Sequence, residues 1–338
     1  MRYDFVSDNT AGLAPEALDA LIAANAGFRR SYGADDISAR CAEVIRERLE
    51  ADAEIRFVVS GTAANALALA MLTRPFETVL THQHAHIITD EAGAPGFFGH
   101  GVRLTPLPGR SAKIDLAALQ AALNAPVPGY VQPPGALSLT QVTEYGARYS
   151  SEELRHLIES CRLKGLKVHM DGARLANAAA GGFDLKEIAR LGVDVLVLGG
   201  AKAGAGAVEA LIIFDRTLAP YIDNRLKQAG QVASKARVLV APLLGLLESG
   251  AWEGHAAHAN RMALRLAGGI AARTPFPIVH PVDANLVFVD MTAEVREQLG
   301  RLGWPAYEFS DGSTRFVCSW ATGEAAVDEL VEALARVA

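Results

Sequence analysis

The sequence predicts an α/β protein whose large domain has a mostly parallel β-sheet, followed by a smaller α+β domain. Short runs rich in β-branched residues recur along the first two thirds of the chain, and helical stretches separate most of them. These runs lie at residues 55–60, 77–81, 137–142, 166–170 and 193–198. They are apolar nearly throughout, as is typical of strands covered by helices on both faces.

The first two helices are predicted from local signals. Pro15 lies where proline suits the first turn of a helix, directly after Ala14. A second helix is expected at about 37–50. The apolar run at 208–214 follows the strand at 193–198 after a gap too short for a crossover helix. We therefore expect these two strands to be antiparallel or only loosely connected.

The pattern changes after about residue 215. A long helical region runs to about residue 272, and Pro242 and several glycines are expected to break it. A strand, a helix, a second strand and a last helix follow, at 284–290, 292–300, 313–320 and 324–337. We therefore divide the chain into a large domain with an N-terminal arm, residues 1–240, and a small domain, residues 241–338.

Composition excludes several classes of protein. Half of the residues are apolar, which is too many for a disordered chain. The net charge of -6 gives no basic surface for nucleic acid or an anionic membrane. Three cysteines without a CxxC pair favour reduced thiols in a cytoplasmic protein. The apolar stretch at 193–215 is interrupted by Asp194, Lys202 and Glu209, so we expect two strands around a glycine-rich loop and no membrane span.

Polar or glycine-rich segments follow four of the predicted strands, where a ligand site forms in a doubly wound sheet. The first segment contains Ser60, Gly61 and Thr62, directly before an Ala/Leu-rich helix. Free N–H groups and hydroxyls at a helix N-terminus bind anions. An ordinary helix cap is the alternative.

The second segment is HQHAH, with His82, His84 and His86 at alternate positions. Three imidazoles on one face of a strand are a possible set of metal ligands. One functional histidine, His86, with two neighbours is the interpretation that we favour.

The third and fourth segments supply a carboxylate and an amine. Asp171 ends a buried strand and needs a cation or a donor, and a structural ion pair with Arg174 is one possibility. Lys202 lies among glycines and alanines, and a lysine shielded from water there is a candidate nucleophile. A flexible loop with a solvated lysine is the alternative.

Together these segments have the features that pyridoxal phosphate requires. Its phosphate needs N–H and O–H donors, its pyridinium nitrogen needs an aspartate, and its aldehyde needs a lysine amine. Asp171 and Lys202 follow consecutive predicted strands, so one sheet edge would bring them together.

The sequence resembles the fold-type-I pyridoxal-phosphate enzymes, and within them the low-specificity L-threonine aldolases of the threonine aldolase/β-eliminating lyase family. The resemblance covers nearly the whole chain. Its motifs are FVSDNTAGLAPEA, SYGADDISAR, SGTAANALALA, AHIITDEAGAPGFF, LSLTQVTEYGARYSSEEL, HMDGARLANAAA, VDVLVLGGAKAG, RLKQAGQVASKAR and RFVCSWAT.

The resemblance implies a role for each matching residue. Lys202 would attach the cofactor, Asp171 would hold its ring nitrogen, His86 would stack on its ring, and Glu91 would lie near the substrate hydroxyl. The cofactor phosphate would be held by Ser60, Gly61 and Thr62. The substrate carboxylate would be bound by Ser7, Arg174 and Arg315. A neighbouring subunit's site would be approached by Tyr32 and Lys227. Arg174 and Lys227 would also belong to the cofactor site, and Tyr32 to the substrate site.

The implied activity is cleavage of L-threonine, L-allo-threonine or a related β-hydroxy-α-amino acid to glycine and an aldehyde. The implied assembly is a homotetramer, a dimer of dimers, with sites at subunit interfaces. The sequence departs from its relatives at Ala201 and Ala203, where they commonly have Thr and Asn, and at Ala321, where they often have Asp. These departures bear on cofactor affinity and rate.

Other functions stay open at this point. Within the same resemblance, the protein could cleave phenylserine or catalyse β-elimination, and the sequence does not rank these substrates. From a different class, HQHAH could mark a metal-dependent hydrolase with His169 and Asp171 as further ligands. A cofactor-free regulator on the same fold is a third possibility, suggested only by the alanines beside Lys202.

Overall fold

A seven-stranded sheet forms the centre of the larger lobe, with the strand order β1-β7-β6-β5-β4-β2-β3. Neighbours among β2 to β6 pair in parallel, and β7 is antiparallel to both β6 and β1. The mostly parallel sheet and the antiparallel strand at 208–214 are thus confirmed. The strands are β1 (Glu54–Val58), β2 (Thr78–His82), β3 (Arg103–Leu107), β4 (Pro134–Thr140), β5 (Lys167–Gly172), β6 (Val195–Gly199) and β7 (Glu209–Ile213).

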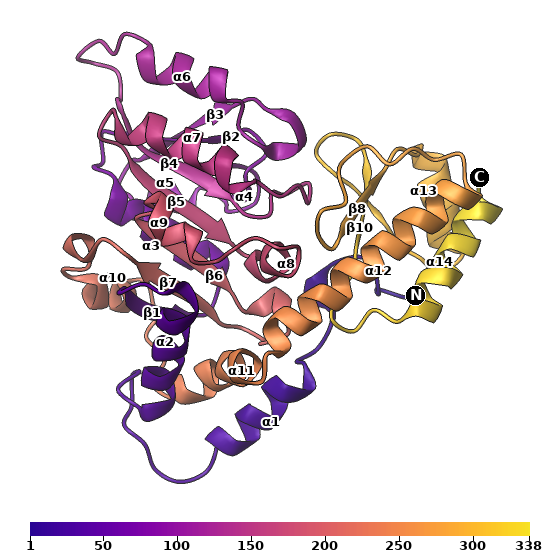
Figure 1. Ribbon diagram of the computed structural model, residues 1–338, viewed down its shortest axis with the longest axis horizontal. Coiled ribbons are helices and arrows are strands. Elements are labelled where there is room, and N and C mark those ends of the chain that lie inside the picture. Colours follow the sequence, from indigo (N-terminus) through magenta and orange to yellow (C-terminus); the bar gives the residue numbers. More distant parts are fainter.

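Helices cover both faces of this sheet in the computed structural model, which describes all residues 1–338 (Figure 1). Alternate residues of β6 show the two layers: Leu196 and Leu198 belong to one core, and Val195 and Val197 to another. The helices of this lobe are α1 (Pro15–Ala24), α2 (Asp36–Leu49), α3 (Gly61–Leu72), α4 (His86–Thr89), α5 (Ala94–Phe98), α6 (Leu116–Asn124), α7 (Ser151–Arg162), α8 (Leu175–Ala180), α9 (Glu187–Leu191), α10 (Ile222–Gln228) and α11 (Ala236–Ser249).

The smaller lobe has a three-stranded antiparallel sheet, in the order β8-β10-β9. Its own core contains Trp304, Phe316 and Leu330, together with Phe5 from the N-terminal arm. Both chain termini lie at this lobe (Figure 1). Its elements are β8 (Leu286–Val289), α13 (Ala293–Arg301), β9 (Tyr307–Glu308), β10 (Thr314–Val317) and α14 (Glu324–Arg336).

The long helix α12 (Ala251–Arg273) joins the two lobes (Figure 1). Trp252, near its start, is buried in the core of the large lobe, whereas Met262 and Ile270 are buried in the core of the small lobe. Helix α11 packs against α1 and α2 in the large lobe. A domain boundary at residue 240 stays a prediction, and we propose that the connection lies within α12.

Two details differ from the sequence-based expectations. Pro242 does not break a helix: it is buried inside α11, and the break comes at Gly250, whose φ of +77° suits glycine. Strand β3 was not expected, because it contains Pro106 and is only partly buried at the edge of the sheet. No helix in the structure is both long enough and apolar enough to span a membrane.

Candidate active site

A cavity of about 490 Å³ opens at the carboxyl edge of the large sheet. Ser60 follows β1, His86 follows β2, Asp171 lies near the end of β5, and Lys202 follows β6; all four line this cavity. The four segments singled out in the sequence therefore meet at one place, because parallel strands present their carboxyl ends to the same edge.

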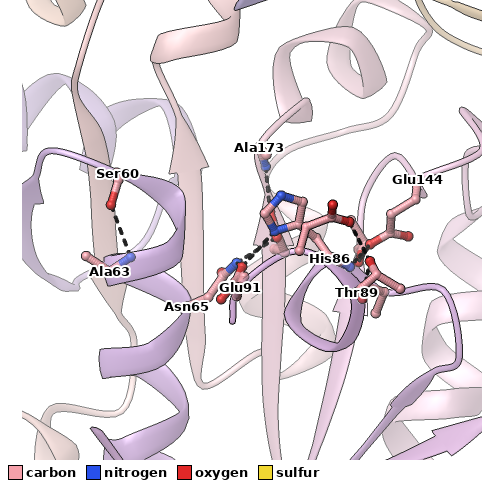
Figure 2. Close-up of polar contacts among 12 residues, drawn as sticks. Ser60, Ala63, Asn65, His86, Thr89, Glu91, Glu144 and Ala173 are labelled. Atoms are coloured by element: carbon pink, nitrogen blue, oxygen red, sulfur yellow. Dashed lines mark hydrogen bonds and ion pairs between the residues drawn. The ribbon is translucent and has the colours of Figure 1, made fainter. Parts of the chain in front are cut away.

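The N-terminus of α3 forms one wall. The hydroxyl of Ser60 accepts a hydrogen bond from the Ala63 N–H group at 3.3 Å, so Ser60 is the helix cap (Figure 2). Gly61 and Thr62 also line the cavity, and nothing lies within 4 Å of a Cβ placed on Gly61. The first N–H groups of a helix have no partner within the helix, so this wall can both cap α3 and receive an anion.

Asp171 is held as a buried carboxylate. Its Oδ2 atom accepts a hydrogen bond from Asn65 Nδ2 at 2.9 Å, and its Oδ1 atom accepts one from the Ala173 N–H group at 2.9 Å. Burial alone would raise the pKa of Asp171, but the positive charge of Lys202 and these hydrogen bonds bring it below its ordinary value. The structure thus places Asp171 and Lys202 in one cavity, where their charges interact.

The His86 ring is fixed by a second carboxyl group. Its Nδ1 atom lies 2.8 Å from Glu91 Oε1, which also accepts a hydrogen bond from Asn65 Nδ2 at 2.8 Å (Figure 2). The hydrogen bond with Glu91 raises the pKa of His86. Glu91 is buried behind His86 and is not among the residues that line the cavity. Its contacts in the structure are therefore those of a residue that orients His86.

The other two histidines of the HQHAH segment point to different partners. His82 Nε2 lies 3.1 Å from the Gly109 carbonyl oxygen, and His84 Nδ1 lies 3.1 Å from Ser310 Oγ. No three His, Cys, Asp or Glu side chains in the structure are grouped so that they could hold one metal ion. The donors of HQHAH therefore do not form a metal site with His169 and Asp171.

Arg174 pairs with Asp8 of the N-terminal arm, so the alternative of an Asp171–Arg174 ion pair is wrong. Its Nε and Nη2 atoms donate to the two oxygens of Asp8 at 2.7 and 2.9 Å. Asp171 already accepts hydrogen bonds from Asn65 and Ala173, whereas the buried Asp8 lies within ion-pair distance of the guanidinium.

Arg315, on β10 of the small lobe, forms no ion pair, although the charges of Asp8 and Asp90 act on it, and it does not line the cavity that contains Lys202. Burial lowers its pKa, and the positive charge of Arg174 lowers it further. A partly buried guanidinium beside a second one favours an anion between the lobes.

Ser7 does not line the cavity. It caps the short 3-10 helix at Asp8–Thr10, where its hydroxyl oxygen accepts a hydrogen bond from the Asn9 N–H group at 3.2 Å. Asn9 lines the cavity instead.

Sequence reasoning missed three polar residues of the site. Asn65 joins Asp171 to Glu91, as described above. Glu209, the first residue of the reversed strand β7, accepts from the Gly200 N–H group at 2.8 Å and lines the cavity near Lys202. Glu144 also lines the cavity. Burial raises the pKa of both glutamates to about 7. Glu209 could have been recognised as a site residue because it is a charged residue within the apolar run at 208–214. No feature of the sequence marks Glu144 in this way.

Tyr32 and Lys227 lie elsewhere in the single chain. They line a separate cavity of about 720 Å³ between α2, β1 and α10, where the Lys227 Nζ atom is 5.2 Å from the centre of the Tyr32 ring. The structure of one chain does not bring them to the cavity that contains Lys202.

The donor set of the first cavity fits pyridoxal phosphate. Its volume suits a small cofactor, and its walls supply a helix N-terminus for a phosphate, a buried carboxylate for a ring nitrogen, an imidazole and a lysine. These parts, on this sheet topology, define the class of fold-type-I pyridoxal-phosphate enzymes. An aspartate aminotransferase from Thermus thermophilus shares the fold, with a TM-score of 0.73 and 19% identity over 99% of this chain and 92% of that one.

Comparison with known proteins narrows the class. The sequence matches the family described as beta-eliminating lyase over residues 4–294, and the chain belongs to this family. A low specificity L-threonine aldolase from Pseudomonas sp. (strain NCIMB 10558) is 42% identical over 96% of this chain and 95% of its own length. A threonine aldolase from Leishmania major has a TM-score of 0.91 and 32% identity, covering 98% of this chain and 99% of that one.

Proposed function

We propose that the protein is a pyridoxal-phosphate-dependent aldolase that cleaves L-threonine, L-allo-threonine or a related β-hydroxy-α-amino acid to glycine and an aldehyde. The observation that carries the proposal is the meeting of Lys202, Asp171 and the N-terminus of α3 in one cavity. The relatives named as threonine aldolases at 42% and 32% identity, each over nearly the whole chain, support the same activity.

In this proposal the cofactor, when bound, supplies an electron sink for the bond that breaks. Lys202 provides the amine to which it is attached. Asp171 stays ionised at neutral pH because Lys202 lowers its pKa, and it holds the ring nitrogen protonated. Ser60, Gly61 and Thr62 receive the phosphate. His86, with its ring fixed by Glu91, stacks on the cofactor ring.

The substrate carboxylate is assigned to the guanidinium of Arg315, with Arg174 beside it and Ser7 in the adjoining arm. Arg315 has no acidic partner, whereas Arg174 is already paired with Asp8. Two-point binding by a guanidinium fixes the orientation of a carboxylate, so the Cα–Cβ bond can be held in the position from which it breaks. Arg315 lies on the small lobe, so substrate binding would join the lobes.

We also propose that the enzyme is a cytoplasmic homotetramer in which Tyr32 and Lys227 reach a neighbouring subunit's site. Both residues line a cavity at the surface of the chain. Exposed apolar side chains on and near α1 support an interface in this region, among them Leu18, Ile22 and Phe28.

The first experiment tests the cofactor and the reaction together. Protein purified with pyridoxal phosphate should be yellow, and borohydride reduction followed by peptide mass spectrometry should find the cofactor on Lys202. L-Threonine should yield glycine and acetaldehyde. The Lys202→Ala variant should lose this turnover, because no other lysine lines the cavity.

Product analysis separates the remaining alternatives. Release of a keto acid and ammonia would indicate β-elimination, and faster aldehyde release from phenylserine than from threonine would indicate an aryl substrate. A colourless protein that contains stoichiometric zinc and releases no aldehyde would contradict the proposed function.

A further inference from the structure

Glu144 has one carboxyl oxygen that the protein does not use. Its Oε1 atom accepts hydrogen bonds from the His86 N–H group and from Thr140 Oγ1, both at 2.9 Å. Its Oε2 atom is buried and has no hydrogen-bond partner. Buried polar atoms without a partner are rare in proteins because each one costs free energy. The residue lines the active-site cavity, so a ligand there can supply the missing partner.

The other acidic groups that line the cavity are Asp171 and Glu209, and both are already engaged. Both oxygens of Asp171 accept hydrogen bonds, from Asn65 and Ala173. Glu209 accepts from the backbone of the loop that carries Lys202. Glu91 also has a buried oxygen without a partner, Oε2, but its Oε1 atom is held by His86 and the residue does not line the cavity. In the view of Figure 2, Glu144 lies on the other side of His86 from Glu91.

We propose that Glu144 is the catalytic residue that accepts the proton of the substrate's β-hydroxyl group, an inference that rests on the proposed aldol cleavage. The proton passes to Oε2, and the electron pair of the O–H bond becomes the second carbon–oxygen bond of the aldehyde. The Cα–Cβ bond breaks, and its electron pair stays with Cα. A proton delivered to Cα then completes glycine, so that protons and electrons balance.

The surroundings of Glu144 suit a base that works near neutral pH. Burial raises its pKa to about 7, and the negative charge of Asp171 on β5 adds to this. The other titratable groups around it are His86 on α4 and the neighbouring Tyr145 and Tyr149. A general base is most effective when its pKa lies close to the working pH.

The test is the Glu144→Gln variant, assayed with L-threonine from pH 5 to 9. The glutamine oxygen can still accept from His86 and Thr140, so the fold of this wall is preserved while the basic group is lost. We expect kcat/KM for aldehyde release to fall by about 10²- to 10⁴-fold, and the rise in activity near pH 7 to disappear. Glu152→Gln, on an exposed residue at the start of α7, is the matched control and should behave as wild type.

Two further measurements do not depend on cleavage. Exchange of the glycine α-proton with D₂O needs no β-hydroxyl group, so it should persist in the Glu144→Gln variant. In cofactor-free protein, infrared difference spectra should show carboxyl absorption that titrates near pH 7 in wild type, and the variant should lose the part due to Glu144 while the part due to Glu209 remains. If this variant does not fold, Glu144→Asp should keep the pH dependence but cleave more slowly.

The outcomes separate the two proposals. If wild type releases no aldehyde from any β-hydroxy amino acid, the proposed function fails, and this inference fails with it. If wild type cleaves threonine and Glu144→Gln does so at the same rate with the same pH profile, the role of Glu144 alone is overturned. Loss of glycine exchange together with cleavage would also overturn it, because Glu144 would then serve assembly of the site.

Discussion

At the scale of single residues, the two arginines near the site differ in whether the protein supplies them with an ion-pair partner. Arg174 has two hydrogen bonds to Asp8, whereas Arg315 is half-buried, forms no ion pair and has a pKa lowered by burial and by the charge of Arg174. A guanidinium that is removed from water without an ion-pair partner destabilises the ligand-free protein, and a bound carboxylate stabilises it strongly. The arginine with no partner is therefore the one that we assign to the substrate.

Replacing Arg315 with Ala should raise KM for L-threonine by about 10- to 100-fold, because a hydrogen-bonded charge contributes about 1.5–3 kcal/mol. The folded protein should not lose stability to a similar degree, since an unfavourable buried charge is removed as well. Steady-state kinetics and urea unfolding check the two halves of this prediction. Arg301→Ala, on the exposed end of α13, is the control. An unchanged KM would place the carboxylate elsewhere.

Residues differ in how far they could be predicted from sequence. Asp171 and Lys202 could be predicted because each lies at or shortly after the end of an apolar strand, and strand ends are visible locally. Glu144 lies in an irregular segment after β4, and it reaches His86, which is 58 positions earlier, only through the folded sheet. The partner of Arg174 is 166 positions away in the arm. Such long-range pairs leave no signal in a single sequence.

At the scale of secondary-structure elements, β5 and β6 approach each other closely where they deliver Asp171 and Lys202. A Cβ placed on Gly172 would lie 2.4 Å from the Val197 carbonyl oxygen, and one placed on Gly199 would lie 2.3 Å from the Ala173 carbonyl oxygen. Backbone atoms cannot give way cheaply at such distances. These glycines are therefore part of what sets the spacing of the two functional side chains.

The Gly199→Ala variant should lose about 1–3 kcal/mol of unfolding free energy, because the added methyl group overpacks the strand ends. It should also bind pyridoxal phosphate more weakly, as absorbance titration would show. Gly268→Ala is the matched control: its Cβ meets nothing within 4 Å inside α12, so the change should stabilise by about 0.5–1 kcal/mol. Equal stability of the two variants would contradict the close approach.

Helices and strands that have clear apolar runs or capping residues were predicted correctly. Elements without such local features were not. The parallel strands, the reversed strand at 208–214 and the terminal helices follow from apolar runs and their spacing. Strand β9 has only two residues, Tyr307 and Glu308, both exposed, and it forms because β10 offers it an edge. The expected break at Pro242 was wrong: the proline is buried inside α11, and tertiary packing can outweigh a local helix-breaking tendency.

At the scale of the whole molecule, Asp8 ties three parts of the chain together. It belongs to the N-terminal arm, its oxygens accept from Arg174 in the large lobe, and its Oδ2 atom also accepts from Asn285 Nδ2 in the small lobe at 3.0 Å. Burial would raise the pKa of Asp8, but the charges of Arg174 and Lys202 and these hydrogen bonds lower it overall. Asp8 thus adds a buried charged contact to the apolar and polar contacts that join the lobes.

The Asp8→Asn variant should lose about 3 kcal/mol of unfolding free energy at pH 7, because the Arg174 guanidinium is left without its carboxylate. A lowered pKa stabilises the folded state above the ordinary value of 3.8, and this contribution disappears as the pH falls through the folded value. The difference between wild type and variant should therefore shrink at pH 3. Urea unfolding of the cofactor-free proteins at both pH values checks this, with the exposed Asp19→Asn on α1 as control. A difference that stays constant with pH would contradict the assigned pKa.

The N-terminal arm contacts a strand that is synthesised near the end of translation, so its packing must come late. The Phe5 carbonyl oxygen accepts a hydrogen bond from the Val317 N–H group at 2.9 Å, and the Phe5 ring is buried in the small-lobe core. These partners are separated by about 310 residues. At ordinary rates of translation the arm waits roughly 15–60 s for its partner strand, with Phe5 uncovered. A nascent chain that already carries Lys202 and Asp171 therefore still lacks Arg315 and Asn285, which donates a hydrogen bond to Asp8.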